Sequence, residues 1–372
     1  MINNINTKEM HRQAMQHAQN AHLALDNGDE KSALHLFEQA YELEHDVAMS
    51  YLNSDKEPTR SIVFRSAAVL ANKCKKFREA EKMINLGLAG NPPEEIAEEM
   101  RIIYEDINFY RHLRLHNTEL DSSEIQLSIS GKGVGYGIVN SEEFLNRFQI
   151  IEQLTYRTAE RILGKEYRIK GAVAKDIKEK FEPYLSTPMA ASFAVKIRVG
   201  KPTFTSSLFP NEIYQEVIDE LINDLEILNC ANETLLNNKI ADSSYYQNFV
   251  SLAKGLAPDG EIIGQVGLTV VRGNKEKFVA IKRTQKDILE RLSNDFVLKN
   301  KEEKIFEVQG SILNTDDYYK TLTIETQSND HIVVTVPDGL SDIVRIYWND
   351  PVKATIAENS QTKQLISIER FV

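Results

Sequence analysis

Residues 14–40 read AMQHAQNAHLALDNGDEKSALHLFEQA, and their spacing sets the character of the N-terminal part of the chain. In the first half of this stretch, alanines recur at intervals of three or four residues, which places them on one face of a helix. Gly28 interrupts the pattern, and a second helical stretch follows it. We therefore predict a helical hairpin over residues 8–45.

A second stretch, FREAEKMINLGLAGNP at residues 77–92, repeats features of the first. The matching positions are Gly28, Asp29, Ala33, Phe37 and Ala40 in the first copy, and Phe77, Ala80, Ile84, Gly87 and Pro92 in the second. This pattern resembles tetratricopeptide repeats. The resemblance implies that a glycine ends the first helix, that alanines let paired helices approach closely, and that a proline closes the unit. It also implies a protein-binding module that carries out no chemistry. Residues 94–116, which contain neither glycine nor proline, are interpreted as a capping or connecting helix.

The resemblance further implies which side chains face a concave groove, because the first helix of each repeat lines it. The candidate partner-binding residues obtained in this way are His22, Asp26, Arg65, Asn72 and Lys73. Arg65, Asn72 and Lys73 resemble a carboxylate clamp, in which cations bind the carboxylate and an amide holds the peptide backbone. Because only two repeats are evident, three occupants stay open: an external protein, the chain's own middle domain, or a second copy in a homo-oligomer.

The composition is that of an ordinary globular protein, with 372 residues, 42% hydrophobic and 27% charged, and a net charge of -11. No run approaches the length of a membrane helix, and the polar start MINNINTKEMHRQ lacks a signal core. We expect a cytoplasmic protein without a membrane partner. Cys74 and Cys230 lie far apart and neither belongs to a CxxC pair, which argues against a disulfide scaffold and a thiolate zinc site. We assign no cofactor, no metal and no catalytic residue.

The predicted fold class is multidomain α+β, with three domains. Residues 1–118 form tetratricopeptide-like α-helical hairpins. Residues 119–298 form a central antiparallel α+β domain, since EIQLSIS alternates and EIIGQVGLTVVRGNKEKFVAIKR reads as a hairpin between helical blocks. Residues 304–372 carry five short strands and are predicted to be a small β-barrel, SH3-like or OB-like. The middle and C-terminal parts resemble uncharacterised bacterial proteins, a resemblance that implies no function.

Four alternating glycines from Gly131 to Gly137 raise the question of a phosphate loop. The spacing fits neither the dinucleotide fingerprint nor the P-loop, because Gly133 follows Lys132 where the P-loop needs Ser or Thr. A glycine-rich hairpin or a strand in close backbone contact is the favoured interpretation.

Basic residues of the central domain are candidates for a nucleic-acid surface, provided that the strands carrying them are neighbours. They are Lys170, Lys196, Arg198, Lys201, Arg272, Lys282 and Arg283. The C-terminal domain is a poorer candidate because residues 301–372 hold seven basic and twelve acidic side chains, which would repel phosphates. Most of its aromatic residues, which include Phe306, Tyr319, Tyr347, Trp348 and Phe371, are therefore expected in its core.

The function expected from these observations is that of a non-enzymatic protein–protein interaction or adaptor protein, with a second ligand on the basic face of the central domain. One alternative is a nucleic-acid-binding regulator or an accessory component of a bacterial defence or toxin-control system, an analogy from domain style alone. Another alternative is an enzyme with dispersed active-site residues in the central domain. A deep pocket lined by titratable groups with perturbed pKa values would support that alternative.

Overall fold

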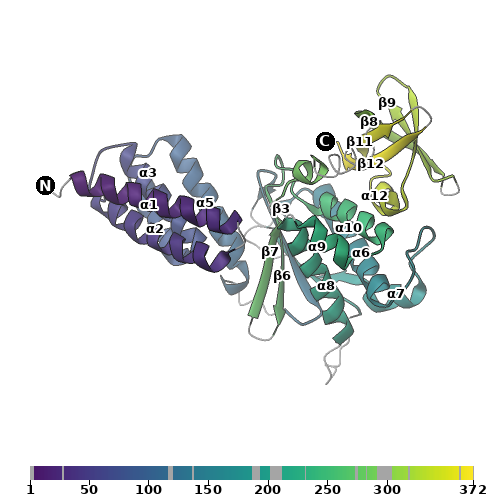
Figure 1. The fold of residues 1–372 in the computed structure, drawn as a ribbon, viewed down its shortest axis with the longest axis horizontal. Coiled ribbons are helices and arrows are strands. Elements are labelled where there is room, and N and C mark those ends of the chain that lie inside the picture. The colour runs from purple at the N-terminus through teal and green to yellow at the C-terminus, as the bar shows by residue number, and fades with distance from the viewer. Residues whose placement is uncertain are drawn as a thin grey trace. The chain divides into compact units, whose positions relative to one another are not determined.

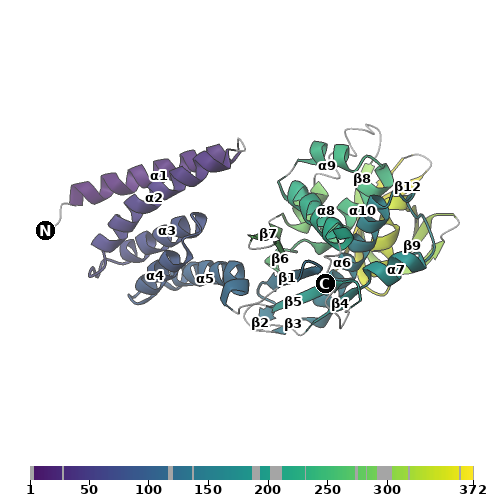
Figure 2. The ribbon, with the colours of Figure 1, turned by 90° about the horizontal axis from the view of Figure 1, so that it is seen from below.

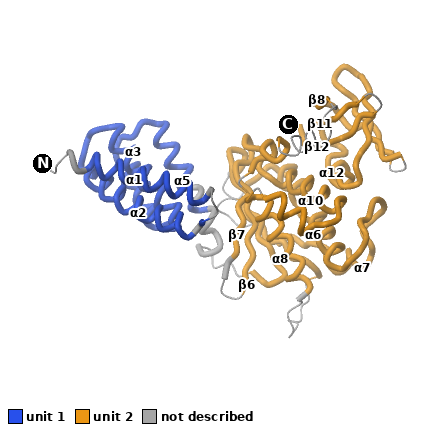
Figure 3. Tube along the Cα trace, viewed as in Figure 1, with its two compact units in different colours: residues 1–118 blue, residues 119–372 orange. Residues whose placement is uncertain are grey.

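The computed structural model describes residues 4–26, 29–115, 120–135, 138–186, 193–201, 212–230, 232–272, 275–281, 283–290, 304–316, 319–359 and 362–371. The chain divides into two compact units, residues 1–118 and residues 119–372 (Figure 3). The first unit coincides with the predicted helical domain, and the second contains both the predicted central domain and the predicted barrel. Within the described residues, each helix is too short or too polar to cross a bilayer.

The described part of the first unit contains five helices (Figure 1). They are α1 (Asn4–Asp26), α2 (Glu30–Ser50), α3 (Thr59–Lys73), α4 (Phe77–Leu88) and α5 (Glu94–Leu115). Helix α1 packs on α2, and α3 packs on α4, so these four helices form two helical hairpins. The side chain of Asp29 caps α2 by accepting a hydrogen bond from the backbone amide of Ser32. Gly28, which the sequence placed at the turn, lies outside the described residues.

Small residues lie between the packed helices, at positions where the resemblance to tetratricopeptide repeats implied them. Ala33, Ala40 and Ala80 are almost fully buried. A Cβ atom on Gly87 would lie 2.6 Å from the Sδ atom of Met100, which is itself fully buried on α5. A larger residue at this position would therefore force Met100 to shift where α4 meets α5.

The second unit contains a five-stranded sheet in the order β4-β5-β1-β6-β7, with each neighbouring pair antiparallel. The strands are β1 (Glu124–Ser130), β4 (Pro183–Leu185), β5 (Phe193–Val199), β6 (Gln265–Arg272) and β7 (Lys275–Ile281). Alternate residues of the central strand β1, such as Leu127, are buried against helices that cover one face of the sheet (Figure 2). These helices are α6 (Ser141–Ile162), α8 (Glu212–Asn229) and α10 (Ser243–Leu256). The predicted α+β class is thus confirmed.

The glycine cluster contains a small hairpin of β2 (Val134–Gly135) and β3 (Ile138–Val139). The amide of Gly133 donates a hydrogen bond to the carbonyl of Ile262 at 2.9 Å. Gly131 has a φ of 152°, and a Cβ atom there would lie 2.5 Å from the same carbonyl oxygen. Close backbone approach therefore accounts for these two glycines; Gly137 lies outside the described residues.

The five C-terminal strands form a closed barrel in the order β10-β12-β11-β8-β9. Their bounds are β8 (Lys304–Asp316), β9 (Thr321–Thr326), β10 (His331–Thr335), β11 (Pro351–Glu358) and β12 (Lys363–Arg370). The short helices η1 (Asp338–Leu340) and α12 (Ser341–Ile346) join β10 to β11 and pack on α10. One continuous hydrophobic core extends through the sheet, its helices and the barrel.

The barrel aromatics do not follow the expectation that most of them are core residues. Tyr347 is buried, but Tyr319 is 71% exposed, and both Trp348 and Phe371 are more than one-third exposed. The reason is that aliphatic residues such as Leu322, Ile324 and Ile356 fill the interior of this narrow barrel.

Candidate functional site

A groove of about 440 Å³ lies in the first unit, where α1, α3 and α5 converge over one residue of α2. Alternate helices of the chain therefore line the same hollow. The lining residues are Met15, Ala18, His22, Phe37, Arg65, Ser66, Val69, Leu70, Lys73, Glu99, Ile102 and Ile103.

The floor of the groove is apolar. Val69 is 37% exposed and Ile102 is 52% exposed, so large aliphatic side chains from two helices are open to a ligand. Phe37 of α2, which also lines the groove, is buried, and the ring of His22 meets it edge-on with centroids 5.1 Å apart. The aromatic contact fixes the orientation of the imidazole at the edge of the floor.

Basic side chains border this apolar floor. Arg65 of α3 forms an ion pair with Glu99 of α5, and both side chains remain partly exposed. Lys73 lies two turns further along α3, on the same face as Arg65 and Val69. A bound segment that carries an apolar side chain next to a carboxylate would match both the floor and its border.

Three of the five predicted partner-binding residues meet in this groove: His22, Arg65 and Lys73. Asn72 is half-buried on α3 and does not line the groove. Asp26 ends α1, and its side chain lies outside the described residues. Sequence reasoning missed Glu99 and Ile102, because α5 was interpreted as a connecting helix. Its position beside α3 gives it the same role in the groove as α1 and α3.

The predicted nucleic-acid residues occupy two faces of the sheet. Lys196 pairs in register with Gln126, and Arg198 donates a hydrogen bond to Asp121 at 2.6 Å, on the face opposite Ile125, Leu127 and Ile129 of β1. Arg272 binds Asp219 of α8, on the helix-covered face.

Arg283 also lies on the helix side, where it binds Glu233 of α9 (Glu233–Lys239). Lys170 and Lys201 are exposed in loops, and Lys282 lies outside the described residues. Strand β1 and strand β6 separate β5 from β7, so the described part of the structure does not gather these cations on one surface.

The groove is thus the site at which the sequence prediction and the geometry coincide. Its side chains suit recognition of a protein segment through apolar contact and charge-assisted hydrogen bonds. Comparison of the chain with models of protein families, with curated proteins and with solved structures finds no match.

Proposed function

We propose that this protein is a non-enzymatic, cytoplasmic adaptor that binds an extended segment of a partner protein in the groove of its helical unit. The observation that carries the proposal is the meeting of His22, Arg65 and Lys73, from α1 and α3, around an apolar floor. The first helices of two successive helix pairs thus line one groove, as they do in tetratricopeptide repeats.

The proposed fold details follow the same argument. Helices α1 to α4 form two tetratricopeptide-like units, and α5 supplies the first helix of a third. The C-terminal barrel belongs to the small SH3-like or OB-like type. The helices η1 and α12, inserted between β10 and β11, anchor the barrel to α10.

The chemistry of the groove selects an acidic and apolar segment. The Arg65–Glu99 ion pair is partly exposed, so its net stabilisation in the free protein is small and a ligand carboxylate can displace Glu99. An apolar side chain that covers Val69 and Ile102 removes their exposed apolar surface from water, which favours binding. An octapeptide with Leu or Met next to Asp or Glu combines both features.

The test is a peptide array that compares octapeptides of this acidic, apolar type with matched peptides in which Lys replaces the acids. The wild-type protein should retain the acidic set. The double variant Arg65→Glu with Lys73→Glu should bind it at least about tenfold more weakly, since each lost charge-assisted bond contributes about 1.5–3 kcal/mol. Its thermal midpoint should stay unchanged, because both side chains are partly exposed.

The matched control is Arg78→Glu with Lys82→Glu, which makes the same charge change on the exposed face of α4. Full binding by the control and loss by the groove variant support the adaptor function. Equal loss by both variants, or a fall in thermal stability that parallels the loss of binding, would instead assign Arg65 and Lys73 a structural role.

A further inference from the structure

A second hollow, independent of the helical groove, lies within residues 119–372. This cleft has a volume of about 770 Å³ and runs between the barrel and the helical layer. Phe306 and Glu307 of β8 and Glu369 of β12 line the barrel side. Glu143 of α6, with Glu261 and Glu290 beyond it, lines the helical side. Its volume falls in the range of ordinary ligand sites.

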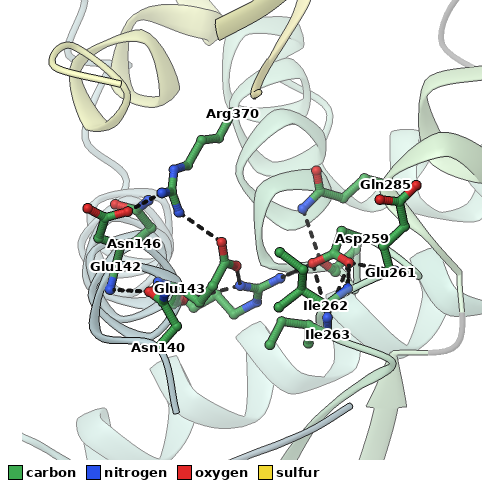
Figure 4. Close-up of polar contacts among 12 residues, drawn as sticks. Asn140, Glu142, Glu143, Asn146, Asp259, Glu261, Ile262, Ile263, Gln285 and Arg370 are labelled. Carbon is green, nitrogen blue, oxygen red and sulfur yellow. Dashed lines mark hydrogen bonds and ion pairs between the residues drawn. The ribbon is translucent and has the colours of Figure 1, made fainter. Parts of the chain in front are cut away.

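Most cations around the cleft are already paired. Glu143 accepts a hydrogen bond from Arg370 at 2.8 Å (Figure 4). It accepts another from Arg147, which also lies 3.7 Å from Asp259. On the barrel side, the Nζ atom of Lys353 lies 2.9 Å from a Glu307 oxygen. These ion pairs join the walls of the cleft.

The carboxylates, by contrast, are in excess. Six acidic and four basic side chains line the cleft. Glu261 and Glu290 are exposed, and neither forms an ion pair with any residue in the described part of the chain. Low-dielectric walls concentrate the field of such unpaired charges inside a cleft and attract ions of the opposite sign.

The floor of the cleft provides an independent sign of a ligand. Tyr347 lines the cleft although it is only 3% exposed, and its hydroxyl has no hydrogen-bond partner among the described residues. It lies directly over Gly255, where a Cβ atom would come within 2.8 Å of the phenol oxygen. A phenol oxygen can accept a hydrogen bond, so this hydroxyl can bind a donor that enters the cleft.

We propose that this cleft binds an organic cation, a protonated amine or a guanidinium carried on an apolar body. The cationic head is attracted by the negative charges of Glu261 and Glu290 and donates a hydrogen bond to the hydroxyl oxygen of Tyr347. The apolar body packs on Phe306 and Leu289. The same chemistry occurs in a free polyamine and in a Lys or Arg side chain of a bound peptide.

Calorimetric titration of the full chain tests the proposal with probes that share one six-carbon body: hexanediamine, the neutral hexanediol and the dianion adipate. An acetylated and amidated tetrapeptide, Ala-Lys-Leu-Ala, represents the peptide source. We expect saturable binding of the diamine or the tetrapeptide, and binding at least about tenfold weaker for hexanediol and adipate. The tighter of the two cationic probes identifies the source.

The variant Glu261→Gln with Glu290→Gln should weaken cation binding about tenfold or more, because it removes two exposed carboxylates without touching the core. The matched control is Glu179→Gln with Glu216→Gln, two other exposed positions in the same unit. Tyr347→Phe keeps the packing over Gly255 and should weaken binding severalfold. The proposal is overturned if no cationic probe saturates the protein, if adipate binds as well as the diamine, or if the Glu261 and Glu290 variant binds like the wild type.

Discussion

Arg157 of α6 and Asp342 of α12 form a buried ion pair, with the Nε atom of Arg157 2.7 Å from a carboxylate oxygen. The same oxygen accepts a hydrogen bond from the amide of Asn248 on α10, at 2.9 Å. The side chains of Arg157 and Asp342 are less than 5% exposed. The Asp342 carboxylate therefore links α12, which lies between two barrel strands in the sequence, to both α6 and α10.

Replacing Asp342 with Ala should destabilise the second unit by about 3 kcal/mol, because it leaves the Arg157 charge buried with Glu160 as its remaining partner. Urea unfolding followed by the fluorescence of Trp348, the single tryptophan of the chain, measures this loss near the affected helix. Lys175→Ala, which removes an exposed pair with Glu179, should change the free energy of unfolding by less than about 0.5 kcal/mol. Equal effects of the two variants would show that the buried pair does not hold the barrel.

Gly87→Ala tests the close approach of α4 to its neighbours. Alanine is normally favoured over glycine inside a helix by about 1 kcal/mol. Here the added Cβ atom would lie 2.6 Å from Met100 and 3.1 Å from the Cβ atom of Phe64, both in the core. We therefore expect the opposite sign, a loss of about 1–2 kcal/mol in calorimetry. Asn85→Ala, on the exposed side of the same helix, should be neutral or slightly stabilising. A stabilised Gly87 variant would contradict the packing argument.

Glu44 makes the stability of the helical unit depend on pH. Its carboxylate is fully buried on α2, and burial raises its pKa above the ordinary value, although His11 lies 2.8 Å away and opposes the shift. A carboxyl with a raised pKa stabilises the fold at pH values below its ordinary pKa, and this contribution is lost as pH rises through the folded-state pKa. The wild type should therefore gain stability relative to Glu44→Gln as the pH falls from neutral.

Calorimetric midpoints measured across the acidic range give this comparison. The exposed Glu42→Gln variant on the same helix is the control, and its curve should run parallel to that of the wild type. If the difference between wild type and Glu44→Gln stayed constant with pH, ionisation of Glu44 would have no role in stability.

The parts of the fold and site that follow local periodicity could be predicted from the sequence. Helical spacing puts His22 on one face of α1, and Arg65 and Lys73 on one face of α3. Once two helix pairs were recognised, the position of all three residues in one groove could be predicted. Strand order could not be predicted in this way. Lys196 lies on the same face as Gln126, and Arg272 lies on the same face as Leu127. The register of β5 and β6 with β1 decides this, and it joins residues far apart in the chain.

The cleft in the second unit was missed for the same physical reason. Arg370 and Glu143 are separated by 227 positions, and no local motif connects the end of β12 with the start of α6. Tyr347 was assigned to the core correctly, but its role at the floor of a cleft depends on Gly255 of another helix. Residues that tertiary packing brings together have no regular spacing in the sequence, so no sequence motif reveals such a site.

The apolar floor of the helical groove gives the last prediction, which separates its contribution from that of the basic border. Ile102→Asn removes an aliphatic side chain that is 52% exposed, so the free energy of unfolding should fall by only about 1–2 kcal/mol, the contribution of its buried half. Covering this side chain with a ligand removes apolar surface from water, so the variant should bind an acidic, Leu-containing octapeptide about tenfold more weakly. Fluorescence anisotropy with the labelled peptide measures the change. Leu34→Asn, at an exposed position on α2 outside the groove, is the matched control. If Ile102→Asn bound the peptide as tightly as the control, the ligand would contact the basic border alone, and the floor would have no part in recognition.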